Sequence, residues 1–166
     1  LRRLGIEDAG MVVLTPDEFT RNDRRVPLPV VTVRRPEALP PSDESWLFAH
    51  VHTEQDIPGS ELSNLEQYLR NLRDAITTDP DRIYSRLLSP RHLAPNQTYH
   101  AFVVPAFEVG RLAGLGKETA GVPAQQPAWD GTTTGLELPV YIEWEFRTGE
   151  RQDFESLVRL LEVLTQ

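Results

Sequence analysis

The sequence predicts an α+β domain: a mixed or mostly antiparallel sheet of about five strands, with three or four helices packed mainly on one side. Three observations predict this class. The β-prone runs do not alternate regularly with helical runs. Two segments carry the apolar repeat of an amphipathic helix, and the most regular strand run has one polar face, which favours antiparallel pairing. The 166 residues fit a single globular domain, 1–166, with a core of its own.

The N-terminal third contains two short strand patterns. The run 10–15 (GMVVLT) is β-prone, and Thr15, Pro16 and Glu18 have the spacing of a capped helical turn. A second strand is predicted over 28–34, where Pro27 and Pro29 place it at a sheet edge or place its start at a margin. The segment 35–45 is rich in proline and is expected to be a loop.

A third strand is predicted over 46–53 (WLFAHVHT). Both of its faces are largely apolar, so we expect a central position in the sheet. The clearest helix follows, with an apolar stripe made by Leu62, Leu65, Leu69, Leu72 and Ile76. Asp79 and Pro80 should end it and begin a second short helix that presents Ile83, Leu87 and Leu88.

The C-terminal half begins with a turn at Asn96 and a strand over 98–104 that is apolar on both faces. Pro105 should stop that strand, and a helix should follow and end at Gly116. Gly110 and Gly114 lie four residues apart, which permits close approach of a neighbouring backbone. The segment 117–137 has no periodicity and is expected to be a long exposed loop, with Trp129 tucked back onto the body.

The strand predicted over 138–149 (LPVYIEWEFRTG) has the most regular alternation in the chain. Its expected core face holds Val140, Ile142, Trp144 and Phe146, and its expected solvent face holds Tyr141, Glu143, Glu145 and Arg147. An amphipathic helix over 152–164 should close the chain.

Composition excludes several classes of function. The net charge of −8 repels nucleic acid and anionic membranes at long range. No apolar run approaches the roughly 20 residues of a membrane helix, so no membrane insertion is expected. The absence of cysteine excludes disulfides, thiolate metal sites and cysteine nucleophiles. A cytoplasmic location is the simplest expectation. The chain begins at Leu1 rather than Met, so we expect a fragment of a larger protein.

Two segments carry a family resemblance. The run 89–116 (SPRHLAPNQTYHAFVVPAFEVGRLAGLG) and the run 138–161 (LPVYIEWEFRTGERQDFESLVRLL) resemble a family of uncharacterised bacterial proteins that are much longer than this chain. Some members of that family are linked to contractile, phage-tail-like injection system gene clusters. The resemblance implies that the chain is one domain of a larger protein. It implies no catalytic residue.

A histidine cluster is the strongest candidate for chemistry. His50 and His52 share one strand face, and a neighbouring strand could bring His100 beside them, with Glu143 or Glu145 nearby. Such a group could hold a divalent transition metal. The alternative is two polar residues near a strand end and one unrelated histidine. Glu143 and Glu145 could likewise form a paired-carboxylate site or a solvated strand face.

Apolar and turn residues account for nearly every patterned position, and no dense polar constellation is left over. We therefore predict a non-catalytic structural or protein-interaction module of a larger bacterial protein, with no cofactor. Its expected partners are other protein subunits or further domains of the parent chain. One alternative is a metal-dependent enzyme that uses His50, His52 and His100. Another is a small-ligand-binding domain lidded by the 117–137 loop.

Overall fold

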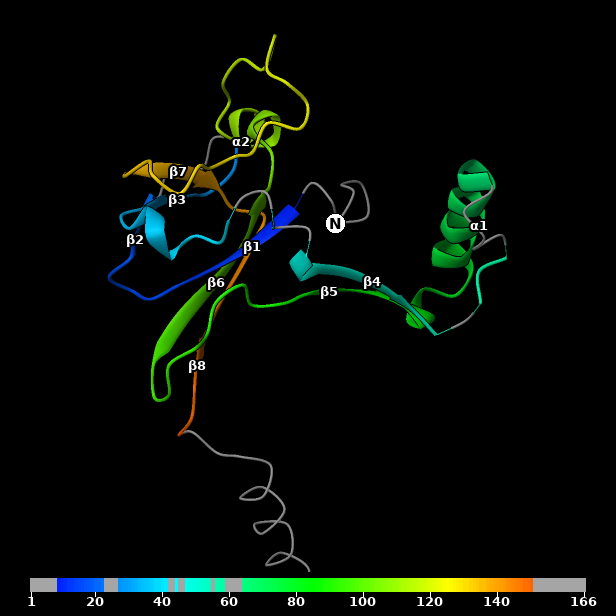
Figure 1. The fold of residues 1–166 in the computed structure, drawn as a ribbon, viewed down its shortest axis with the longest axis horizontal. Helices are drawn as coiled ribbons and strands as arrows, with labels where there is room; N and C mark the ends of the chain where they lie inside the picture. The colour runs from blue at the N-terminus through cyan, green and yellow to red at the C-terminus, as the bar shows by residue number, and fades with distance from the viewer. Residues whose placement is uncertain are drawn as a thin grey trace, which may run out of the picture.

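The computed structural model describes residues 9–22, 27–41, 44, 47–54, 56–58 and 64–150. Within them the fold is α+β, as predicted, but eight strands form three small antiparallel sheets rather than one sheet of about five. Figure 1 shows two sheets close together in a body, and a third that runs away from it. The described residues hold two α-helices rather than three or four, and the helix predicted over 152–164 lies outside them.

The first sheet has the order β1-β6-β8, with β1 spanning Ala9–Leu14, β6 Thr98–Pro105 and β8 Ile142–Arg147. Its central strand, β6, confirms the strand predicted to be apolar on both faces, because every residue from Tyr99 to Pro105 is buried. The Asn96 turn before it is confirmed by a φ of 56°.

The second sheet has the order β2-β3-β7, with β2 spanning Phe19–Asn22, β3 Val30–Val33 and β7 Leu136–Pro139. β3 is its central strand, and the two prolines lie before its start, so they mark a margin and not an edge. Between β1 and β2, residues 15–18 form a tight turn in which the Thr15 amide donates to a Glu18 carboxylate oxygen at 2.7 Å.

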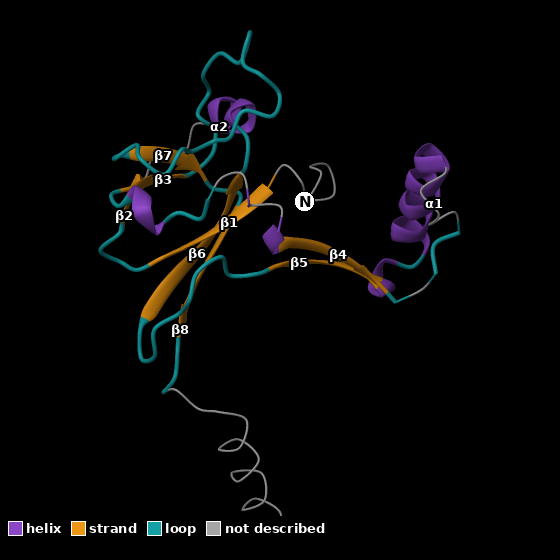
Figure 2. Cartoon of the chain, viewed as in Figure 1, coloured by secondary structure: helices purple, strands orange, loops and turns teal. Residues whose placement is uncertain are grey.

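The main core lies between these two sheets. Phe102 and Val104 of β6 meet Val31 and Val33 of β3 in one buried cluster. Trp129 belongs to the same cluster, and its indole nitrogen donates to the Pro40 carbonyl at 2.7 Å. The expectation that Trp129 folds back onto the body is therefore confirmed, and Figure 2 shows its loop running beside α2 and β7.

The strand predicted over 138–149 is in fact two strands in different sheets. Pro139 has no amide hydrogen and ends β7. The next two amides then bond in different directions, since Val140 donates to Pro29 at 2.8 Å and Tyr141 donates to Val103 at 2.9 Å. The chain thus crosses from the second sheet to the first at this point.

The expected core face of β8 is only partly correct. Phe146 stacks on Tyr99 at 5.8 Å between ring centroids, so the face is the predicted one. Ile142 and Trp144 are nevertheless 44% and 43% exposed. β8 is an edge strand of its sheet, so the described residues cover it less well than the central strand.

The helix α2 (Glu108–Gly114) confirms the helix predicted after Pro105, and Gly116 ends its last turn with a φ of 70°. A Cβ built on Gly114 would lie 2.5 Å from Pro139 Cγ, so a close approach does occur at this glycine, to a proline ring rather than to the expected backbone. Glu108 and Arg111 form an ion pair at 2.6 Å on the same helix.

Two predictions fail in the third sheet, which consists of β4 (Ala49–Thr53) and β5 (Ile83–Leu87). The strand predicted to be central has only one partner. The segment predicted as a second short helix is β5, because a 3-10 turn over Pro80–Arg82 (η5) reverses the chain. Ile83 and Tyr84, which favour strands, then pair with β4.

Candidate protein interface

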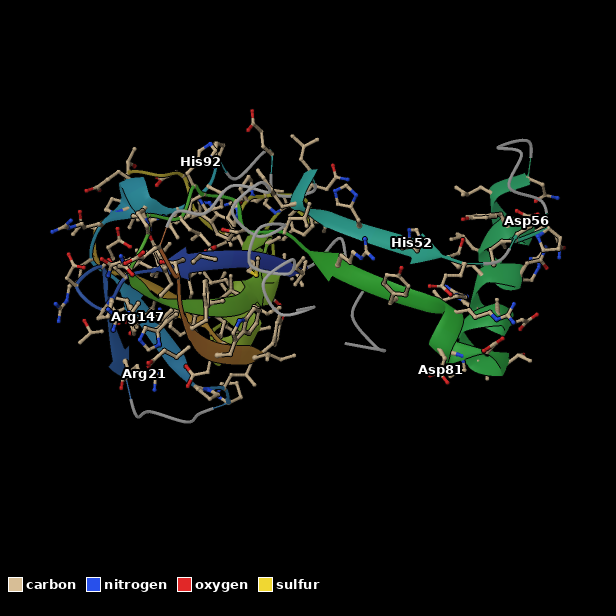
Figure 3. All side chains as sticks on the ribbon, turned by 90° about the horizontal axis from the view of Figure 1, so that it is seen from below. Arg21, His52, Asp56, Asp81, His92 and Arg147 are labelled. Carbon is tan, nitrogen blue, oxygen red and sulfur yellow. The ribbon has the colours of Figure 1, made fainter. Side chains whose placement is uncertain are left out.

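The most distinctive part of the structure is a projecting arm, defined here as β4, residues 56–58, α1, η5 and β5. Figure 1 shows β4 and β5 running away from the two larger sheets and carrying α1 at their far end. Figure 3 gives the same arrangement after a 90° turn, with His52 midway along the arm and Asp56 and Asp81 at its tip. Both views thus show the arm extending away from the body. The sequence predicts instead that the helices form a layer on the sheet.

Backbone pairing defines the ribbon of the arm. Antiparallel register runs from Ala49 opposite Leu87 to Thr53 opposite Ile83, and the Leu88 amide extends it by donating to Phe48 at 2.8 Å. Across the ribbon, His52 packs on Tyr84 with 4.9 Å between ring centroids, and the Arg86 guanidinium lies 4.8 Å from that tyrosine ring. Cross-strand pairs of this kind contribute about 0.2–1 kcal/mol each.

The helix α1 (Leu65–Thr78) begins at Asn64, whose side chain accepts from the Gln67 amide at 3.1 Å. This is an N-cap in the usual sense, because it satisfies one of the free amides of the first turn. The Asn71 side chain ties the helix to its own arm by donating to the Pro58 carbonyl at 2.7 Å. The helix predicted from the leucine stripe is therefore confirmed.

The apolar stripe of α1 is not buried, although its pattern is that of a helix with a covered face. No residue of α1 is buried, and Leu65 and Leu69 are 57% and 40% exposed. Leu72 and Ile76 are half-buried. At the root of the arm, Leu47 and Leu88 are 44% and 47% exposed. Large apolar side chains thus reach solvent at both ends of the arm.

The exposure of the stripe bears on the stability of the arm. An isolated two-stranded ribbon is marginally stable in water at best. A helix of this length gains most of its stability from packing of its apolar face rather than from propensity. In the arm as described, Ile57 is buried and α1 has no buried residue, so the apolar face of the helix is covered only in part. A further surface that covers α1 would supply the missing stabilisation.

The arm is joined to the body by a partly buried ion pair. Arg91, which follows the arm, donates to a Glu18 carboxylate oxygen at 2.7 Å and to the Val13 carbonyl at 3.1 Å. Burial raises the pKa of Glu18, but the Arg91 and Thr15 hydrogen bonds outweigh burial, so the pKa is lower than usual. The Ala94 amide also donates to the Tyr99 hydroxyl at 2.8 Å. No periodicity in the sequence indicates these contacts.

The structure does not bring the three candidate histidines together. His50 and His52 are exposed on β4, where a ring nitrogen of His50 lies 2.8 Å from the Leu47 carbonyl. His100 is 9% exposed on β6 in a different sheet. Its ring lies 3.4 Å from the Arg21 guanidinium, and Figure 3 shows Arg21 in the body, far from His52. No group of three His, Asp or Glu residues that could hold a metal occurs in the described ranges.

The two carboxylates of β8 each face a basic group. Glu143 lies 3.4 Å from Arg21, and Glu145 lies 3.5 Å from the His100 ring. A glycoside-hydrolase pair needs its two carboxyl groups directed at one substrate bond. These contacts are instead a partly exposed ion pair and a carboxylate–imidazole contact at a sheet edge.

An open cavity of about 430 Å³ lies beside α2. Val109 and Gly110 of the helix form one side, and residues of the loop that follows form the other. The loop side is formed by Thr119, Val122 and Ala124, and the lining is completed by Phe107 before α2 and Tyr141 after β7. A smaller cavity, of about 230 Å³, lies where β2, β3 and β8 meet, around Arg21 and Glu143.

Comparisons with protein-family models, with curated proteins and with solved structures find no match. None of the described helices has the length and apolar character needed to cross a membrane.

Proposed function

We propose that the chain is a non-catalytic protein-interaction module, and that the arm is the part that binds protein. The observation that carries this proposal is an α-helix with an apolar stripe and no buried residue, held on a two-stranded ribbon away from the body. Amphipathic helices commonly bind partners by placing such a stripe in an apolar surface. The expected partners are other protein subunits or further domains of a larger parent protein.

The non-catalytic part of the proposal rests on the polar side chains. Glu18, a buried charged residue, and its partner Arg91 are bonded to one another and to backbone. Arg111 is held by Glu108 and by the Glu137 carbonyl. These contacts satisfy the groups structurally and direct none of them into a cleft. The net charge of −8 disfavours nucleic acid, so we propose that the partner is a protein. The proposed setting is the cytoplasm.

A photo-activatable cross-linker placed at two positions tests the proposal in cells that make the parent protein. One probe replaces Leu65 on the stripe, and the matched control replaces Thr133, which is exposed on the body loop. We expect the Leu65 probe to yield a discrete protein adduct, of this chain or another, and the Thr133 probe to yield none. Absence of any adduct at Leu65 would contradict binding through the arm.

The cavity beside α2 favours a second candidate function, a site for a small apolar ligand. Its volume of about 430 Å³ falls within the usual range of ligand pockets, and the loop predicted as a lid forms one wall. We expect an apolar dye to bind there and to be displaced by Ala124→Trp, which fills the cavity. Ala120→Trp, on an exposed part of the same loop outside the lining, is the control. Equal dye binding by both variants would exclude this site.

A further inference from the structure

We propose that α1 binds a second copy of this chain, and that the two α1 helices pair antiparallel about a two-fold axis. This inference rests on the proposed function of the arm and names its partner. Three observations carry it: the symmetry of the apolar stripe, the charges beside it and its exposure.

The spacing of the apolar residues in the stripe is the same in both directions along the helix. Leu65, Leu69, Leu72 and Ile76 follow one another at steps of four, three and four residues. In an antiparallel pair, Leu65 of each helix would therefore meet Ile76 of the other, and Leu69 would meet Leu72. A two-fold contact requires a surface that is complementary to itself. The symmetric spacing supplies that property without any change in the helix.

The charges along one flank of the stripe are complementary in the same orientation. Glu66 and Arg73 lie seven residues apart, about two turns, and so occupy the same side of α1. In an antiparallel pair like flanks meet head to tail, which places Glu66 of each copy beside Arg73 of the other. A parallel pair would not bring these two residues together. The opposite flank carries the uncharged Tyr68 and Ala75.

Half of the stripe and its charged flank are exposed, and the other two stripe residues, Leu72 and Ile76, are half-buried. Leu65 and Leu69 are exposed, and Arg73 is exposed on the flank. The Glu66 side chain is 87% exposed, and its contact with Arg70 is long, at 3.6 Å. An exposed ion pair of this kind is worth little and can be exchanged at small cost. A second copy of the chain, unlike any other partner, necessarily carries the same apolar stripe and the same charged flank in the order that this contact requires.

Sedimentation velocity of the 166-residue chain, from about 1 μM to about 1 mM, tests the proposal. We expect a concentration-dependent dimer. Leu69→Glu should abolish it, whereas Gln67→Glu, which adds the same charge on the opposite face of α1, should leave it intact. Circular dichroism of each variant checks that the helix content is kept.

A charge exchange tests the orientation. Glu66→Arg and Arg73→Glu should each weaken the dimer roughly tenfold, since each places like charges at two symmetric contacts. The double variant should restore it, because the two charges are then exchanged together. Single-variant losses without restoration would overturn the antiparallel pair.

A chain that stays monomeric at the highest concentration would overturn the inference. It would leave the proposed function standing if the Leu65 probe still forms an adduct with a different protein. Failure of both experiments would remove both proposals.

Discussion

At the scale of single residues, Glu18 combines a local contact that the sequence spacing indicates with a distant contact that no local pattern reveals. Glu18 accepts from Thr15 in its own turn and from Arg91, which is 73 residues away in sequence. Because the Glu18 side chain is only 9% exposed, its charge depends on these donors. The same contacts join the end of the arm to β1, so one carboxylate supports both a local turn and a distant junction.

Glu18→Gln should lower the free energy of unfolding at pH 7 by about 1–3 kcal/mol, because it leaves the Arg91 charge without its partner. The folded pKa of Glu18 lies below its usual value of 4.5. Its contribution is therefore present above that value and is lost as the pH falls through the folded pKa. In urea unfolding, the difference between wild type and variant should be larger at pH 7 than at pH 3, because the contribution declines as the pH falls below 4.5. An equal difference at both pH values would contradict this account.

At the scale of elements, α2 and β7 are joined by a close approach at Gly114 and by the hydrogen bond from Arg111 to the Glu137 carbonyl. A Cβ added at Gly114 would lie 2.5 Å and 2.7 Å from two ring carbons of Pro139. Glycine thus allows α2 to approach the strand end at which the chain crosses from one sheet to the other. The four-residue spacing of Gly110 and Gly114 in the sequence indicates close approach, although it does not identify the neighbour.

Gly114→Ala should destabilise the fold by about 1–3 kcal/mol, the usual cost of overpacking, despite the higher helix propensity of alanine. Gly149→Ala is the matched control, because a Cβ there meets no atom within 4 Å. Thermal unfolding monitored by tryptophan fluorescence, to which the buried Trp129 contributes, compares the two variants. A Gly114→Ala midpoint equal to that of wild type would show that α2 can shift away from Pro139 without cost.

Elements whose pattern reflects their own burial could be predicted from the sequence. β6 is apolar on both faces and is central, and the leucine repeat of α1 identifies a helix. The short run from Ile83 to Leu87 fits a helix or a strand equally well, and only pairing with β4 decides between them. In the same way, alternation continues through Val140 and Tyr141, and only tertiary hydrogen bonds divide β7 from β8.

The sequence identifies the residues of the α1 stripe, but it does not show that they form an interface. The stripe of α1 indicates that an apolar face requires cover, but a repeat within one helix cannot show whether that cover belongs to the same chain. The histidine hypothesis fails in its geometry for a related reason. The alternation along β4 correctly places His50 and His52 on one face, yet the strand that pairs with β4 is β5, and His100 lies on β6.

At the scale of the whole molecule, the body and the arm differ in how their stability arises. The body buries a cluster shared by two sheets, which includes Phe102, Val104 and Trp129. The arm meets the body through the root of its ribbon, where Leu87 packs against a second cluster around Tyr99. The distal part of the arm, including α1, contributes no buried residue to either cluster.

Removal of the distal arm should therefore leave the body folded. In the ribbon Thr53 lies opposite Ile83, so a two-residue Asn-Gly turn can replace residues 54–82 and close a short hairpin. We expect this variant to keep the unfolding midpoint of wild type to within a few degrees, since the clusters around Phe102 and Tyr99 are unchanged. Val104→Ala, which removes a fully buried side chain from the body, is the contrasting variant and should lower the midpoint clearly. Near-ultraviolet circular dichroism during heating measures both. A shortened chain that loses its fixed aromatic signal would show that the arm stabilises the body, whereas a folded but strictly monomeric chain would place binding in the segment that was removed.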